Sequence, residues 1–233
     1  STISLLTVDN RNIVIDTGPS SRRPLLKQAL DSRGLEFEDI DTVILTHLHW
    51  DHCQNTDPFS NAKILVHPTE MDYARNPTRN DLATSSYIAD MLDKMDINLV
   101  SDGDEVASGV SILETPGHTK GHIGILVDTG KEKILVSGDA LSDGGTVSRG
   151  IPHNVFWDLE DAQDSVEKML DQSKVFYPGH DRPFRLQADN DIAYLHGPTD
   201  IEIVDTNETG KVTAVTFRVN PDRDANIDTV QKS

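Results

Sequence analysis

The sequence predicts an α/β fold in which two β-sheets pack against each other and helices cover their outer faces. Short apolar runs rich in β-branched residues recur along the chain, and turn-forming residues bound each of them. Segments between these runs carry apolar residues at helical spacing, as expected where helices cover a sheet. No internal repeat, low-complexity tract or linker divides the 233 residues, so we expect one domain covering residues 1–233.

The chain opens with a predicted hairpin, a helix and a strand. Residues 2–8 (TISLLTV) and 12–18 (NIVIDTG) are short β-branched runs separated by turn formers. Residues 24–34 (PLLKQALDSRG) have apolar residues at helical spacing, and Gly34 suits the position after the helix end. Residues 41–47 (DTVILTH) form the next predicted strand, which ends at the first of several histidines.

The rest of the chain continues to alternate strands and helices. Residues 69–95 are predicted to be helical and partly amphipathic, with an interruption near Pro77. Residues 158–173 are a second helix, whose acidic first turn suits the helix dipole. Residues 200–219 are predicted to form a hairpin with a glycine in its turn. Further strand patterns lie at residues 62–68, 109–118, 122–130, 132–140 and 174–181.

Composition limits the classes of partner and compartment. The chain has 39 acidic and 21 basic residues and a formal net charge of −18, so it should repel phosphate backbones and nucleic acid is a poor partner. Cys53 is the single cysteine, which rules out an intramolecular disulfide and fits a cytoplasmic location. No run approaches the roughly 18 apolar residues of a membrane span, and the first ten residues have a strand pattern, not that of a signal peptide.

The stretch LTHLHWDHCQN contains three histidines and one aspartate within six residues. His47 and His49 are two residues apart, so in extended backbone their side chains point the same way. Asp51 and His52 follow where the chain turns, and they can point toward a neighbouring position. Imidazole and carboxylate groups are the ligands that zinc prefers, so this stretch is a candidate part of a metal site.

Three later strands also end in a histidine or an aspartate, at His118, Asp139 and His180. Functional side chains gather on loops at one edge of a rigid sheet, so these residues should join the first four. Together they are enough for two ions roughly 3.5–4 Å apart. A carboxylate can bridge two cations, which is the natural role for Asp139.

These motifs resemble those of the metallo-β-lactamase-fold hydrolases. THLHWDH is similar to their His-x-His-x-Asp-His motif, and TPGHTKGH, SGDA and YPGHD are similar to the later ligand motifs in the same order. The resemblance covers nearly the whole chain and implies an αββα four-layer sandwich. The implied cofactors are two Zn²⁺ ions, with Mn²⁺ or Fe²⁺ as alternatives. The implied ligands are His47, His49 and His118 for the first ion and Asp51, His52 and His180 for the second, with Asp139 between them.

The same resemblance implies a hydrolase in which metal-bound hydroxide attacks a carbonyl group. Asp51 is the expected catalytic residue, because it can bind its metal and also accept or relay a proton. The motif set looks most like that of the N-acyl homoserine lactone lactonase-like group, so the expected substrate is a lactone or a related small ester. One departure is Ser142, which stands where those lactonases carry a tyrosine.

Other activities of the same fold stay open. β-Lactam hydrolysis is one, although Asp139 stands where the commonest lactamases have a cysteine. Thioester hydrolysis of the glyoxalase II type and nucleic acid cleavage are the others, although we see neither a C-terminal helical domain nor an RNA-binding arm. His49 argues against the diiron branch, which has glutamate at that position. A metal-binding regulatory module without turnover is the alternative from another class, and the complete ligand set argues against it.

Several side chains near the motifs have two interpretations. His122 either binds a metal or supports the ligands, and we expect support. Trp50 either lines the pocket or packs in the core, whereas Cys53 is expected to be a small buried residue. His67 is expected to be structural, and His153 and His196 to be solvated. The side chains that either pack within residues 69–95 or form a pocket wall or homodimer contact are Tyr73, Tyr87, Met91 and Met95.

Overall fold

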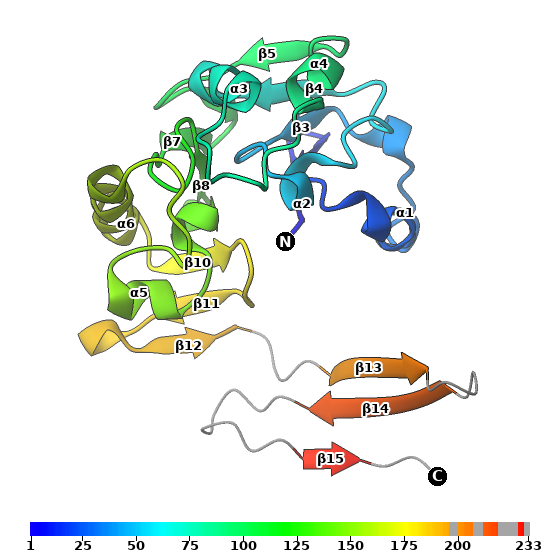
Figure 1. Cartoon of the computed structure of the whole chain (residues 1–233). Helices are drawn as coiled ribbons and strands as arrows, with labels where there is room; N and C mark the ends of the chain where they lie inside the picture. Colours follow the sequence, from blue (N-terminus) through cyan, green and yellow to red (C-terminus); the bar gives the residue numbers. More distant parts are fainter. Residues whose placement is uncertain (196–199, 207–211, 219–227, 231–233) are drawn as a thin grey trace.

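The computed structural model describes residues 1–195, 200–206, 212–218 and 228–230. It confirms the predicted α/β class, with two mixed sheets and helices around them (Figure 1). In the described part of the chain, no helix is long and apolar enough to cross a membrane.

The first sheet has the strand order β1-β2-β3-β4-β5. Asp9 and Asn10 connect β1 and β2, and their φ angles of 52° and 59° are the left-handed values that a two-residue type I′ hairpin turn requires. The other neighbouring strands are parallel. The strands are β1 (Ser4–Val8), β2 (Arg11–Ile15), β3 (Thr42–Ile44), β4 (Lys63–Val66) and β5 (Ile97–Leu99).

The second sheet has the order β12-β11-β10-β9-β8-β7-β6. Its neighbours are antiparallel except β9 and β10, and helix α6 (Leu159–Gln172) makes the crossover between those two. Asp158 caps this helix by accepting the backbone N–H groups of Glu160 and Asp161. The strands are β6 (Glu105–Ala107), β7 (Val110–Glu114), β8 (Ile123–Asp128), β9 (Lys133–Gly138), β10 (Val175–Pro178), β11 (Phe184–Leu186) and β12 (Ile192–Tyr194).

A third, small sheet contains β13 (Asp200–Thr206), β14 (Val212–Arg218) and β15 (Asp228–Val230). β13 and β14 pair antiparallel, which confirms the predicted hairpin. Its glycine-containing turn lies outside the described residues.

Three clusters of buried apolar side chains lie between neighbouring layers of helices and sheets. Strands of the first sheet alternate: Ile13 and Ile15 face the second sheet, whereas Val14 faces the helices. The middle cluster joins the inner faces of both sheets, where Ile44 and Ile112 belong to the same core. The outer clusters pack the first sheet against α1 (Arg23–Asp31), α3 (Pro68–Arg75) and α4 (Ile88–Leu92), and the second against α5 (Gly145–Arg149) and α6. The order is therefore helix, sheet, sheet, helix.

The predicted helix over residues 69–95 is wrong in its central part. Only α3 and α4 are helical, and residues 76–87 are irregular. Asp81 explains part of this, because its carboxylate accepts the backbone N–H groups of Ala83 and Thr84 and so competes with helical hydrogen bonding.

Candidate metal centre

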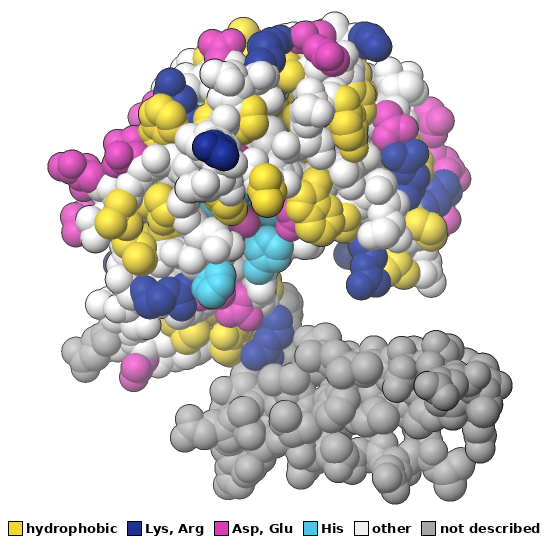
Figure 2. All heavy atoms as spheres, viewed as in Figure 1, with side chains coloured by type: hydrophobic (Ala, Val, Ile, Leu, Met, Phe, Trp, Pro, Cys, Tyr) yellow, Lys and Arg dark blue, Asp and Glu magenta, His cyan; other side chains and the backbone are white. Residues whose placement is uncertain are grey.

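The seven candidate ligands lie at the ends of strands and in the turns that follow them. His47 and His49 follow β3, and Asp51 and His52 lie in the single-turn helix α2 (Trp50–Cys53). The later three follow strands of the second sheet: His118 after β7, Asp139 after β9 and His180 after β10. Figure 2 shows histidine side chains at the surface on this face, between acidic and hydrophobic side chains.

The structure brings all seven predicted residues together. Their potential ligand atoms form overlapping groups in which every atom lies within 4.8 Å of the others. Asp139 is central, because its Oδ1 lies 3.3 Å from His52 Nε2 and its Oδ2 lies 3.5 Å from His118 Nε2. The groups are His47, His49 and His118; His47, His52 and Asp139; and Asp51, His52 and His180.

Protein groups fix the ring orientations of His47 and His52. Thr46 Oγ1 donates its proton to Asp16 Oδ2 at 2.8 Å, so it accepts from His47 Nδ1 at 3.0 Å. The same Asp16 oxygen lies 2.7 Å from His52 Nδ1. Each ring therefore uses Nδ1 to bind the protein and turns Nε2 toward the centre.

The rings of His49 and His118 are fixed in the same way. His118 Nδ1 donates to the backbone carbonyl of Asn154 at 2.8 Å, and its Nε2 faces the centre. His49 is reversed: its Nε2 contacts Asp81 Oδ2 at 3.2 Å, and its Nδ1 lies 3.1 Å from His118 Nε2. In this arrangement His49 Nδ1 and His118 Nε2 both present lone pairs, which repel each other unless a cation lies between them.

Unpaired buried atoms test whether the residues fit metal ions. His47 Nε2, His52 Nε2 and Asp139 Oδ1 are buried and have no hydrogen-bond partner among the described residues. Buried polar atoms are rarely left without a partner, because each costs about 1–3 kcal/mol. All three are donor atoms that Zn²⁺ accepts, and all three face the same centre. The residues present therefore fit divalent metal ions.

Some side chains of the centre are neutral and others are charged. Burial lowers the pKa of His47 well below its usual value and lowers that of His118 to about 4, so both rings are neutral, as metal ligands must be. Hydrogen bonds to Asp139 and Asp51 raise the pKa of His180 to about 9. Burial raises the pKa of Asp139, but the His52 charge and the hydrogen bond from His180 outweigh it and hold that pKa well below its usual range.

Three supporting acids were not predicted from the sequence. Asp16 and Asp81 contact candidate ligands, as described above. Glu70, which is fully buried, accepts the backbone N–H groups of Leu48 and Gly121 at 2.9 Å each. It thereby ties the turn between His47 and His49 to the loop that carries His118. Only Asp16 had a signal in the sequence, because its predicted strand ends in an aspartate, as other strands end in a histidine or an aspartate.

Other predicted residues have clear positions. His122 supports the ligands as expected, since its Nε2 accepts the backbone N–H of Asp139 at 3.1 Å and its Nδ1 contacts Thr115 Oγ1 at 2.8 Å. Cys53 is fully buried, as predicted. Trp50 is 45% exposed, so the core interpretation is wrong for this residue.

The structure confirms some predictions for the remaining histidines and for the side chains of residues 69–95, but not all of them. His67 caps α3 and contacts Glu114, which confirms a structural role, whereas His196 lies outside the described residues. His153 is exposed, as expected for a solvated histidine. Met91 and Met95 pack against the first core cluster and Tyr73 is buried, but Tyr87 is exposed.

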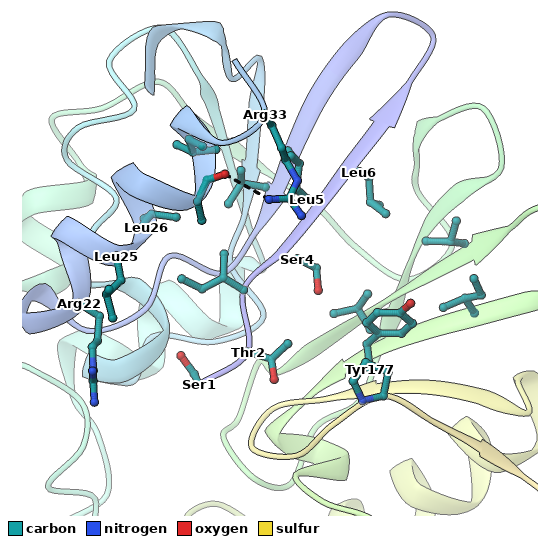
Figure 3. A pocket seen from close by; sticks show the side chains of 18 of the residues that line it. Ser1, Thr2, Ser4, Leu5, Leu6, Arg22, Leu25, Leu26, Arg33 and Tyr177 are labelled. Carbon is teal, nitrogen blue, oxygen red and sulfur yellow. Dashed lines mark hydrogen bonds between the residues drawn. The ribbon is translucent and has the colours of Figure 1, made fainter. Parts of the chain in front are cut away.

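A cavity of about 750 Å³ lies apart from the candidate ligands, between α1, β1 and the inner face of the second sheet. Figure 3 shows Leu25 and Leu26 of α1 on one side of it and Tyr177 of β10 on the other. Ser1 lines the cavity, and its hydroxyl donates to the backbone carbonyl of Asp51. None of the seven candidate ligands lines this cavity, so we do not place the chemistry there.

Comparisons with known proteins agree with this geometry. The family model for the Metallo-beta-lactamase superfamily matches residues 1–180. Metallo-beta-lactamase domain-containing protein 1 of Xenopus laevis is 35% identical over 176 residues, which cover 75% of this chain and 68% of that protein. An N-acyl homoserine lactonase of a Bacillus species is 29% identical over 154 residues, 64% of this chain and 58% of that enzyme. The match thus spans less than two thirds of the lactonase.

A solved structure shares the fold of this chain. It is an N-acyl homoserine lactone hydrolase with the product N-hexanoyl-L-homoserine bound at the catalytic metal center. The two chains are 25% identical with a TM-score of 0.65, and the match covers 76% of this chain and 79% of that one. With the family match, the shared fold and the gathered histidines and aspartates, the conclusion is that this chain belongs to the metallo-beta-lactamase superfamily and is a metallo-hydrolase of that fold.

Proposed function

We propose that this chain is a dinuclear metal-dependent hydrolase that opens lactone rings or cleaves related small esters. One observation carries the proposal: four histidines bind protein groups through one ring nitrogen and turn the other toward a common centre. The first ion would be held by His47, His49 and His118, the second by Asp51, His52 and His180, and both by Asp139. Imidazole and carboxylate ligands suit Zn²⁺, with Mn²⁺ or Fe²⁺ as alternatives.

The residues around the ions have distinct tasks in the proposed reaction. Two divalent ions, when bound, lower the pKa of a water molecule and polarise the substrate carbonyl. Asp51 accepts a proton during ring opening. Burial raises its pKa, but His180 and His52 outweigh that effect and leave its pKa below the usual value, so it is ionised at neutral pH. Its Oδ2 lies 3.2 Å from His180 Nε2, which orients the carboxylate.

An apolar surface beside Asp51 favours a substrate with an apolar part. Trp50 is exposed although it directly precedes Asp51. Its backbone N–H donates to the carbonyl of Ala83, next to the exposed Leu82, and Tyr87 is exposed further along the same segment. This surface suits the acyl chain of an N-acyl homoserine lactone, which the related lactonases bind.

We also propose that nucleic acid is not the substrate and that the protein is cytoplasmic. Its net charge of −18 argues against nucleic acid as the substrate, and its single cysteine argues for the cytoplasm. One domain covering residues 1–233 and a homodimer through residues 69–95 both stay predictions. Limited proteolysis and light scattering of the purified chain would test them.

Turnover measurements test the proposed function. Fully metallated protein should hydrolyse acyl homoserine lactones and simpler lactones, with release of acid that a pH indicator follows. A chelator should abolish the activity, and Zn²⁺ or Mn²⁺ should restore it. The same protein should be screened on β-lactams, thioesters and phosphodiesters. Activity on one of these panels and none on lactones would replace the lactonase proposal, and full metal loading without any turnover would favour a binding module.

A further inference from the structure

We propose that Asp81 is a positioning residue for the first metal ion: its carboxylate holds His49 in the tautomer that turns a lone pair of Nδ1 toward that ion. This inference rests on the proposed metal centre. Asp81 lies outside the motifs that carry the candidate ligands, in the irregular segment between α3 and α4.

The contacts of Asp81 show what its carboxylate can do. The residue is 5% exposed, and its Oδ1 accepts the backbone N–H groups of Ala83 at 2.9 Å and Thr84 at 3.1 Å. Its Oδ2 accepts the hydroxyl protons of Tyr73 at 2.9 Å and Thr84 at 2.7 Å, and it lies 3.2 Å from His49 Nε2. An ionised carboxylate only accepts, so the proton of the last contact must be on His49 Nε2.

The tautomer has a consequence on the other side of the ring. When Nε2 carries the proton of a neutral imidazole, Nδ1 presents a lone pair. That atom lies 3.1 Å from His118 Nε2, whose own ring gives the Nδ1 proton to Asn154. The two lone pairs face each other and repel unless a cation lies between them. Asp81 therefore favours metal binding over a hydrogen bond between the two rings.

The segment that carries Asp81 is joined to both rings. Thr84 forms an isolated antiparallel bridge with His49, so the carboxylate and the imidazole are held at a fixed separation. Thr78 Oγ1 donates to the carbonyl of Phe156 at 3.0 Å, and the Phe156 ring meets the rings of His49 and His118 edge-on at 5.0 and 5.4 Å. Residues 78–84 thus connect the loops that carry the two histidines.

A purely structural role is the alternative, because Asp81 also holds its own segment together. Tyr73→Phe is the matched control: it removes one donor to the same carboxylate and leaves the contact with His49 intact. If Asp81 acts only within its segment, Tyr73→Phe and Asp81→Ala should affect metal binding in the same direction and to similar extents. If Asp81 acts through His49, only Asp81→Ala should weaken metal binding.

The experiment measures metal affinity and tautomer separately. In a His180→Ala background, which weakens the second site, Zn²⁺ affinity is measured by competition with a chromophoric chelator. Asp81→Ala should lower the affinity about 10–100-fold, as expected for loss of a residue that orients a metal ligand, and Tyr73→Phe should change it by less than about threefold. Equal effects of the two substitutions, or no effect of Asp81→Ala, would overturn the inference.

Nitrogen NMR of the imidazoles supplies a readout that needs neither metal nor turnover. In the metal-free wild-type chain, His49 should have its proton on Nε2, whereas a proton on Nδ1 would reject the role of Asp81 even if the variants fail to fold. Failure of lactone hydrolysis with the expected tautomer and affinities would reject the proposed substrate and leave the role of Asp81 standing.

Discussion

Asp16 and His52 form a buried hydrogen bond in which Asp16 Oδ2 lies 2.7 Å from His52 Nδ1. Asp16 directly follows β2 and has a left-handed φ of 57°, and its two oxygens also accept the backbone N–H and the hydroxyl of Thr46 at 2.8 Å each. One carboxylate thus supports Thr46, which directly precedes His47 in the first candidate motif, and His52, a candidate ligand of the proposed second ion.

Asp16→Asn should weaken the second metal and destabilise the fold. An amide has one acceptor oxygen in place of two, so its NH2 group must oppose either the backbone N–H of Thr46 or the proton of His52 Nδ1. We expect metal affinity to fall about 10–100-fold and the free energy of unfolding to fall by about 1–3 kcal/mol. Chelator competition and urea denaturation measure the two effects. Asp9→Asn is a matched control, because Asp9 is exposed and has a similar φ of 52°; equal losses in both variants would contradict the assignment.

Removal of single ligands should separate the two ions. Elemental analysis of reconstituted wild-type protein should give two ions per chain, and a plateau at one ion would reject the dinuclear proposal. His180→Ala should leave one ion, since His180 is partly exposed and belongs only to the group with Asp51 and His52. Asp139→Ala should lower turnover by more than about a hundredfold, because its two oxygens lie between the groups and loss of a merely supporting residue already costs 10–100-fold.

Metal binding should release protons at neutral pH. Hydrogen bonds to Asp139 and Asp51 raise the pKa of His180 to about 9, so its imidazole is protonated at pH 7 in the metal-free protein and must lose a proton to bind an ion. Deprotonation of His180 should therefore raise the apparent affinity for the second ion by up to about tenfold per pH unit between pH 7 and 9.

Calorimetry in two buffers with different ionisation enthalpies measures the number of protons released. His180→Ala is the control, and it should release fewer protons than the wild type. The same heat in both buffers for wild-type protein would show that no proton is released and would refute the assigned charge state.

Glu70→Gln should destabilise the protein because both oxygens of Glu70 accept backbone N–H groups, from Leu48 and Gly121. Glutamine keeps one acceptor, so one buried N–H loses its partner at a cost of about 1–3 kcal/mol. The change in urea midpoint at constant slope gives this loss. Glu167→Gln, on the exposed side of α6, should change stability by less than about 0.5 kcal/mol. A change that small at Glu70 would mean that its contacts do not hold the two loops together.

The class of fold and the candidate ligands could be predicted from the amino-acid sequence alone. Alternating apolar runs predicted the longer strands, such as β7 to β9, because burial on one or both faces leaves a period that can be read directly. The three-residue strands β5 and β11 were not predicted, since they are too short to show that period. The candidate ligands could be predicted because imidazoles and carboxylates that recur at successive strand ends are typical of a metal site and unusual in a purely structural loop.

The contacts that hold the candidate ligands in place could not be predicted from the sequence, because they form between distant segments. Glu70 and Asp81 act on groups that lie 22 to 51 residues away in the chain, and no local spacing indicates such a contact. Asp81 also accepts the backbone N–H groups of Ala83 and Thr84, and this buried carboxylate outweighs modest helical propensity, so residues 76–87 form an irregular segment in place of the expected helix. Local patterns reveal which side chains can bind a metal, whereas the direction of each imidazole depends on hydrogen bonds that form only when distant segments pack together.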